Sequence, residues 1–155
     1  MELLLIRHAT AESSAASDFE RALTDVGNSQ AEKVGQFLKR SNLVPDVTLA
    51  SPLVRARQTA EIICSSAGAA SPLIEPWLAC GMRPASVMQE LAAYDQFHRV
   101  ALVGHNPDFE YFAAWLLGAQ SGEINVRKAS LIYFSRLAPP SQGACLEMML
   151  PVSVM

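Results

Sequence analysis

Basic side chains and two histidines follow three short apolar runs of this sequence. They are Arg7, His8, Arg55 and His105. The runs are typical of buried strands, and ligands of an open α/β sheet bind beyond the carboxyl ends of its strands. We therefore expect these side chains to converge. Arginine guanidinium groups present forked N–H donors that match phosphate geometry, so the sequence predicts a site for a phosphoryl group.

The two histidines indicate what such a site could do. Neutral imidazole can attack phosphorus, which makes His8 a candidate nucleophile, provided that its other ring nitrogen donates to a backbone carbonyl. His105 is then placed to hold the transferring oxygens. The alternative for each histidine is a structural contact at a strand end or turn. Ser51 is interpreted as a helix cap rather than a nucleophile, because no base is indicated for it.

The elements that position these residues alternate along the chain. The predicted strands cover 2–7, 47–50, 72–75 at an edge, 100–103, 131–137 and 145–150, with 11–18 as a loop. The predicted helices run from the cap Thr24 to Ser41-Asn42, from the cap Ser51 and Pro52 to Gly68, over 84–98, and from the cap Asn106 and Pro107 to Gly118. This order favours one α/β domain over 1–155, with a mostly parallel sheet and an antiparallel C-terminal hairpin.

Composition excludes several classes of protein and of binding site. The chain has 155 residues, half of them apolar, and a net charge of −3 from 12 Lys+Arg, nine of which are Arg, against 15 Asp+Glu. A chain this apolar can bury a core, and its weak acidity gives no reason to expect nucleic-acid binding. The longest apolar run, 111–117, is too short to cross a bilayer, and the start shows no targeting pattern, so we expect a cytoplasmic protein. Three widely spaced cysteines indicate neither a disulfide framework nor a zinc site.

Four ordered segments resemble a known family. Leu5-Ile6-Arg7-His8-Ala9 is similar to the RHG/RHA signature of the histidine phosphatase superfamily, which is phosphoglycerate mutase-like in fold. The segments 18–27, 51–60 and 103–107 also fit it, and more narrowly they resemble the small phosphohistidine phosphatases of the SixA type. Four motifs in order are far more specific than one. The resemblance implies a three-layer sandwich with helices on both faces of the sheet.

The resemblance also implies a role for each site residue. It makes His8 the residue that is phosphorylated, Arg7 and Arg55 phosphate clamps, His105 the second histidine of the pocket, and Arg21 a third basic contact, with Asp18 in the same loop as a group that orients Arg21. The placement after three strands supports the first four independently. Only the resemblance places Arg21 over the pocket.

One departure from the family bears on the substrate. Larger members that cleave phosphate esters use a carboxylic acid to protonate the leaving oxygen, and here Glu75 is a candidate without a convincing acid motif. Imidazole leaves more easily than an alkoxide. The sequence therefore favours a phosphohistidine substrate. A broad phosphatase acting on small esters with Glu75 as the acid, and a non-catalytic module that binds phosphoanions, are the alternatives.

The expected partner is a phosphohistidine-bearing protein. The resemblance points to a histidine phosphotransfer domain or a phosphotransferase-system carrier. We expect no metal and no organic cofactor, because His8, His105 and a carboxylate lack the spacing of a known metal motif. Nothing in the sequence demands more than a monomer, and no nucleic acid or membrane is expected as a partner.

Overall fold

One mixed sheet forms the centre of the protein in the computed structural model, which describes residues 1–120, 122 and 124–155. Within these residues six strands lie in the order β3-β2-β4-β1-β5-β6. Their bounds are β1 Glu2–Arg7, β2 Val47–Ala50, β3 Leu73–Ile74, β4 Arg99–Gly104, β5 Leu131–Ser135 and β6 Cys145–Leu150. Strands β1, β2, β3 and β4 are parallel, whereas β5 and β6 pair antiparallel at one end, as predicted.

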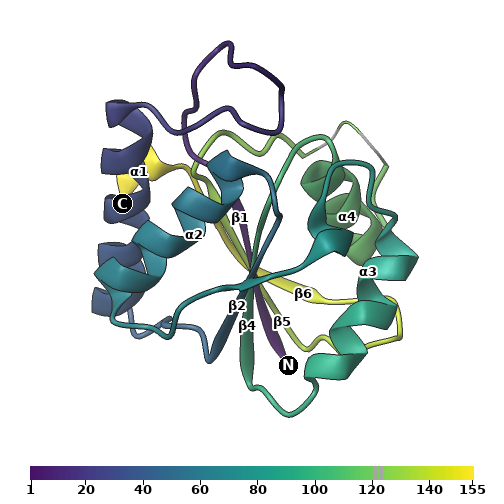
Figure 1. Ribbon diagram of the computed structural model, residues 1–155. Coiled ribbons are helices and arrows are strands. Elements are labelled where there is room, and N and C mark those ends of the chain that lie inside the picture. The colour runs from purple at the N-terminus through teal and green to yellow at the C-terminus, as the bar shows by residue number, and fades with distance from the viewer. Residues whose placement is uncertain (121, 123) are drawn as a thin grey trace.

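Helices cover both faces of this sheet. Their bounds are α1 Asp25–Arg40, α2 Val54–Ala67, α3 Pro84–Leu91 and α4 Asp108–Leu117. Figure 1 shows α1 and α2 on one side of the sheet and α3 and α4 on the other. Because side chains alternate along a strand, Leu3 and Leu5 of β1 join the core under α3 and α4, while Leu4 and Ile6 join the core under α1 and α2. The three-layer α/β sandwich is therefore confirmed.

Three predicted elements are shorter than the sequence pattern indicated. The strand predicted over 131–137 ends at Ser135, beyond which Arg136 has a positive φ of 61°. The helix predicted over 84–98 ends at Leu91 and continues as one 3-10 turn, Ala92–Tyr94. Phe97, beyond that turn, still packs against the core, which explains its place in the apolar pattern. The edge strand predicted over 72–75 pairs only through Leu73 and Ile74, both of them exposed.

Two predicted helix caps are wrong. Helix α2 has Leu53 at its N-cap and α4 has Pro107, and neither cap uses a side-chain hydrogen bond. The side chains of Ser51 and Asn106 bind other partners, described below. Thr24 does cap α1, accepting from the Gly27 amide, and Gly68 ends α2 in the left-handed region with φ 75°.

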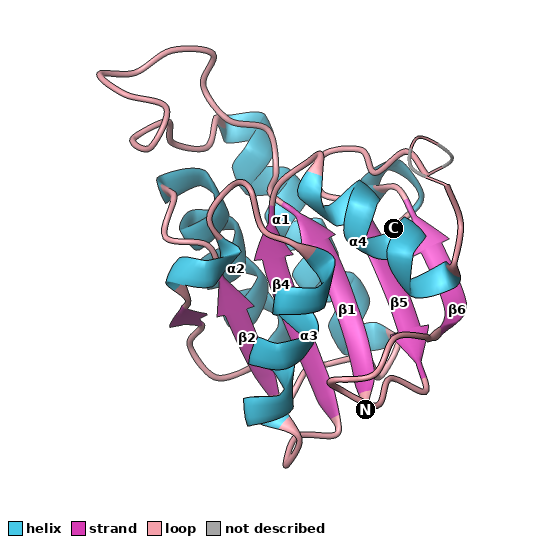
Figure 2. Cartoon of the chain, turned by 90° about the vertical axis from the view of Figure 1, so that its right-hand side faces the viewer, coloured by secondary structure: helices cyan, strands magenta, loops and turns pink. Residues whose placement is uncertain are grey.

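The segment between β1 and α1 rises above the carboxyl ends of the parallel strands (Figures 1 and 2). Its two stems are joined where Ala11 bridges Leu23 and where the Thr24 amide donates to the Thr10 carbonyl at 3.1 Å. Gly27 permits this close approach, since a Cβ there would lie 2.0 Å from the Thr10 carbonyl oxygen. We call residues 12–22 the β1–α1 loop. Among the described residues, no helix has the length and apolarity to span a membrane.

Candidate active site

The two histidines predicted from the sequence lie side by side. His8 follows β1 and His105 follows β4, and these strands are adjacent and parallel, with Arg7 in register with Gly104. The His8 amide donates to the Gly104 carbonyl at 2.9 Å. The two rings are 5.2 Å apart between centroids, and both side chains are buried. The convergence expected at the end of the sheet is therefore observed.

The backbone fixes the proton on His8. Its Nδ1 lies 2.8 Å from the Ala9 carbonyl oxygen, which can only accept, so Nδ1 carries the proton and donates. This geometry confirms the expected donation to a backbone carbonyl and leaves Nε2 with its lone pair. Burial lowers the pKa of His8 to about 4, and the positive charges of Arg55 and Arg7 act in the same direction. His8 is therefore a neutral base at neutral pH.

Ser51 orients His105, a role that the sequence analysis missed. The Nε2 atom of His105 lies 2.7 Å from the Ser51 hydroxyl oxygen, which also accepts from the Leu53 amide at 3.3 Å. The hydroxyl can donate its proton to Nε2, and when it does so the ring proton of His105 is on Nδ1. Burial lowers the pKa of His105 to about 3, with His8 and Arg55 adding to the shift. The signal that could have identified Ser51 is its place at the end of β2, the strand beside β4.

Arg55 enters the site from the first turn of α2 and is held by the β1–α1 loop. Its Nη1 donates to the Asp18 carbonyl at 2.6 Å and its Nη2 to the Asp18 carboxylate at 3.0 Å. The other carboxylate oxygen of Asp18 accepts from Arg21 at 2.8 Å. Hydrogen bonds from Arg21 and then Arg55 lower the pKa of Asp18. Asp18 contacts Arg21, as the sequence suggested, and it also joins Arg21 to Arg55.

Arg7 is braced by residues that the sequence analysis did not single out. Its Nη1 donates to the Val126 carbonyl at 2.7 Å. The Val126 amide donates to the Glu110 carboxylate at 2.9 Å, and Asn106 donates both to that carboxylate, at 2.6 Å, and to the Val126 carbonyl, at 2.8 Å. Asn106 and Glu110 stand four residues apart, the spacing of neighbours on a helix face, and this was the available signal.

Thr59 links the turn at His8 to helix α2. The Ala9 amide donates to its hydroxyl oxygen at 3.1 Å, and that hydroxyl donates to the Arg55 carbonyl one helical turn earlier at 2.6 Å. The backbone after His8 and the helix that carries Arg55 therefore form one unit.

Glu75 is placed differently from the other candidates. It follows β3, two strands away from β4 in the sheet order, and accepts a hydrogen bond from the Tyr94 hydroxyl at 2.6 Å. Burial and Glu75 together raise the pKa of Tyr94 to about 12. The hydrogen bond of the Glu75 side chain is thus with Tyr94, which packs against the core, and its role as an acid stays a prediction.

In the described part of the chain, five buried polar side-chain atoms lack a hydrogen-bond partner. Three of them belong to site residues, namely Nε of Arg7, Nε of Arg55 and Nδ1 of His105, and the other two are Oγ1 of Thr48 and Oδ1 of Asn106. Buried donors without partners are costly, and the oxygens of a phosphoryl group would satisfy them. Across residues 1–120, 122 and 124–155, no group of three His, Cys, Asp or Glu side chains is arranged to hold a metal ion. The arrangement combines one nucleophilic nitrogen with several N–H donors.

Comparison with known proteins places this site in a family. Residues 3–78 match the model of the histidine phosphatase superfamily (branch 1). An uncharacterized protein of Picosynechococcus sp. is 36% identical over 139 residues, covering 85% of this chain and 83% of that protein.

Solved structures share the fold over nearly the whole chain. The protein histidine phosphatase SixA complexed with tungstate superposes with a TM-score of 0.89 at 22% identity, over 99% of both chains. The alpha-ribazole phosphatase from Shigella flexneri superposes with a TM-score of 0.79 at 17% identity, over 98% of this chain and 97% of that one. The fold and the family model define a phosphatase. The chain belongs to the histidine phosphatase superfamily, as its four motifs predicted.

Proposed function

We propose that the protein is a phosphohistidine phosphatase that takes the phosphoryl group of a phosphohistidine protein onto His8. The observation that carries this proposal is the state of His8: Nδ1 is committed to the Ala9 carbonyl, so Nε2 is neutral and nucleophilic, and Arg7, Arg55 and His105 surround it. A module that only binds anions has no need of such a nucleophile.

In the first step Nε2 of His8 attacks phosphorus in line. The N–P bond to the substrate breaks, and its electron pair leaves with the substrate imidazole, which departs neutral when its other nitrogen carries a proton. The guanidinium groups of Arg7 and Arg55 and the Nδ1–H of His105 stabilise the charge on the equatorial oxygens. Arg21 donates to Asp18 at the rim and so helps to position the carboxylate that contacts Arg55.

In the second step water attacks the phosphorus of phospho-His8. The Nδ1 proton stays bonded to the Ala9 carbonyl throughout, so His8 leaves as neutral imidazole in the tautomer with which it began. Inorganic phosphate is released. Neither step requires a carboxylic acid to protonate a leaving nitrogen. The hydrogen bond that the Glu75 carboxylate accepts from the Tyr94 hydroxyl is compatible with such a mechanism, because Glu75 then has no step to perform.

A second candidate is a phosphatase of small phosphate esters. It is favoured by the fold shared with the alpha-ribazole phosphatase from Shigella flexneri. An alkoxide leaving group needs a proton, and Glu75 is the residue predicted to supply it. In this case Glu75→Gln should lower ester hydrolysis by at least tenfold and leave phosphohistidine hydrolysis unchanged.

Ranking rates over a panel of substrates tests the proposal. The purified protein is offered phosphorylated histidine phosphotransfer domains, a phosphorylated phosphotransferase-system carrier, free phosphohistidine, sugar phosphates and p-nitrophenyl phosphate. We expect the highest kcat/KM on a phosphohistidine protein, with a burst of acid-labile phosphoenzyme after rapid mixing. Higher kcat/KM on the esters together with sensitivity to Glu75→Gln would establish the second candidate instead.

A further inference from the structure

An exposed aromatic ring stands at the rim of the site. Phe19, in the β1–α1 loop, is 50% exposed, and it directly follows Asp18, which contacts Arg55. Single exposed apolar residues are common on protein surfaces, so exposure alone carries no meaning. Phe19 is distinguished by its position, because it directly follows the residue that holds Arg55.

The backbone on both sides of Phe19 is held in place. The Val54 amide donates to the Phe19 carbonyl at 3.1 Å, and Arg55 donates to both the carbonyl and the carboxylate of Asp18. Next to Phe19 on its other side, the Glu20 amide donates to the Ser17 carbonyl at 3.2 Å. An aromatic side chain on a backbone that is already ordered loses little conformational entropy when it binds. Phe19 is therefore organised for contact before any partner arrives.

Cys80 adds a second apolar group near the same arginine. The residue as a whole is exposed, whereas its thiol is partly covered by the protein, and Arg55 and Asp18 are close enough for their charges to act on that thiol. Burial of the thiol raises the pKa of Cys80, so it is neutral at neutral pH and behaves as a small hydrophobe. The surroundings of Arg55 thus combine a cationic centre with an aromatic ring and a neutral thiol.

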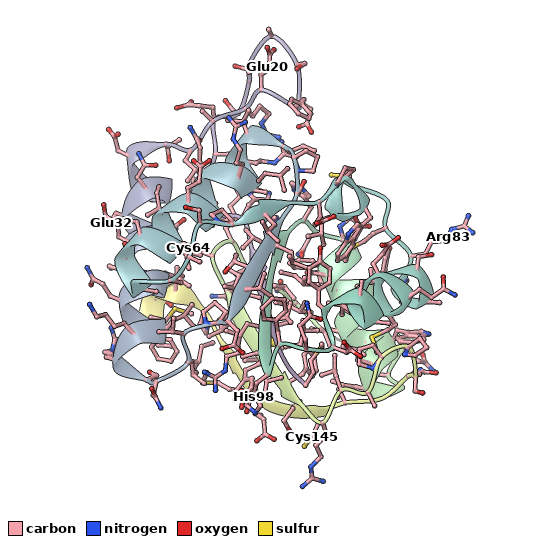
Figure 3. The ribbon with its side chains drawn as sticks, turned by 60° about the horizontal axis from the view of Figure 1, so that its bottom comes forward. Glu20, Glu32, Cys64, Arg83, His98 and Cys145 are labelled. Atoms are coloured by element: carbon pink, nitrogen blue, oxygen red, sulfur yellow. The ribbon has the colours of Figure 1, made fainter. Side chains whose placement is uncertain are left out.

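We propose that Phe19 docks on an apolar patch beside the phosphohistidine of the substrate protein and so selects a folded protein over a free phosphate. The inference rests on the proposed function. A phosphoryl group held by Arg55 brings the surface that carries it against the β1–α1 loop, whose outer end is marked by Glu20 in Figure 3. A small phosphate has no such surface to offer. Aromatic residues at the centre of an interface commonly dominate its binding energy.

The test compares two substrates with the same phosphorylated group. Phe19→Ala, Phe19→Leu and wild type are assayed on a phosphorylated histidine phosphotransfer domain and on free phosphohistidine. Leu146→Ala is the matched control: Leu146 is 42% exposed on β6, next to Cys145 at the end of the molecule opposite Glu20 (Figure 3). We expect Phe19→Ala to raise KM for the domain about tenfold with kcat unchanged, and to leave free phosphohistidine turnover unchanged.

The other variants define how the proposal fails. Phe19→Leu should recover most of the lost affinity, and Leu146→Ala should match wild type on both substrates. Equal losses of kcat/KM on both substrates in Phe19→Ala would mean that the ring shapes the pocket. No loss on either substrate would mean that the ring does not contact the substrate protein. Each result overturns the docking role and leaves the phosphohistidine activity of the wild type unaffected. Wild-type turnover of phosphate esters but of neither phosphohistidine substrate would instead contradict the proposed function, and the docking role with it.

Discussion

The floor and the rim of the site are built in different ways. On the floor, His8 and His105 are buried at the ends of two adjacent strands, and their partners are a carbonyl and a hydroxyl that the sheet holds fixed. The rim is the β1–α1 loop, in which residues 12–20 are all exposed and order comes from the contacts of Asp18 with Arg21 and Arg55. The floor therefore sets the protonation states of the two histidines, whereas the rim is exposed and is held by contacts of its own side chains.

Removing the nucleophile should abolish the chemistry of the floor. We expect His8→Ala to lower turnover at least a thousandfold and to abolish acid-labile phosphoenzyme, because no other group in the site is placed to carry the phosphoryl group. Steady-state rates and phosphoenzyme trapping measure this. His98→Ala is the control, since that histidine is exposed and lies 3.8 Å from the Glu2 carboxylate, away from the site. Persistence of phosphoenzyme in His8→Ala would disprove the covalent role of His8.

The contact between rim and floor is tested by Asp18→Asn. Loss of the carboxylate charge weakens its hydrogen bonds to Arg21 and Arg55, while the Asp18 carbonyl still accepts from Arg55. We expect kcat/KM on a phosphohistidine protein to fall about tenfold because the clamp is held less firmly in place. Glu61→Gln is the matched control, since Glu61 pairs with Arg57 on the exposed face of α2 at 3.7 Å. A rise in kcat/KM for Asp18→Asn would show that the carboxylate competes with substrate.

The protonation states of the floor can be read directly. Burial holds the pKa of His8 at about 4 and that of His105 at about 3, so we expect neither ring to protonate between pH 7 and pH 5. Heteronuclear NMR of the imidazole nitrogens across a pH series measures both, with exposed His98 as an internal reference. It should also show the proton of His8 on Nδ1. Protonation of His8 above pH 6 would remove the basis for a neutral nucleophile.

The same shifts predict a smaller effect on stability. A histidine in the unfolded chain has a pKa of about 6.5. Below that pH the unfolded chain binds protons, whereas the buried rings of the folded protein stay neutral. The free energy of unfolding should therefore rise with pH between about 4 and 6.5. We expect stability to fall by an amount on the order of 5 kcal/mol, about half from each ring, as the pH drops from 7 to 4.5. Urea unfolding at a series of pH values measures it. His105→Gln should flatten the dependence, and an unchanged slope would contradict this source.

Local patterns predicted the fold because they reflect local physics. Continuous apolar runs marked β1, β2 and β4, which are buried on both faces, and the cap at Thr24 marked the start of α1. The same rules failed at Ser51 and Asn106. Both have the side chain of a good cap, but His105 lies within reach of the Ser51 hydroxyl across 54 residues of sequence, and Glu110 and Val126 engage the Asn106 amide. A capping rule does not include such competitors.

The sequence by itself determined which residues meet. The order of strands and turns brings Arg7, His8, Arg55 and His105 to one edge of the sheet, because the carboxyl ends of parallel strands share that edge. Only the tertiary structure decided the chemical state of each group: which nitrogen of His8 carries the proton, how far burial lowers the pKa of each histidine, and that Asp18 joins two arginines. These properties depend on distances of a few ångströms between residues far apart in the chain, and spacing along a sequence does not encode them.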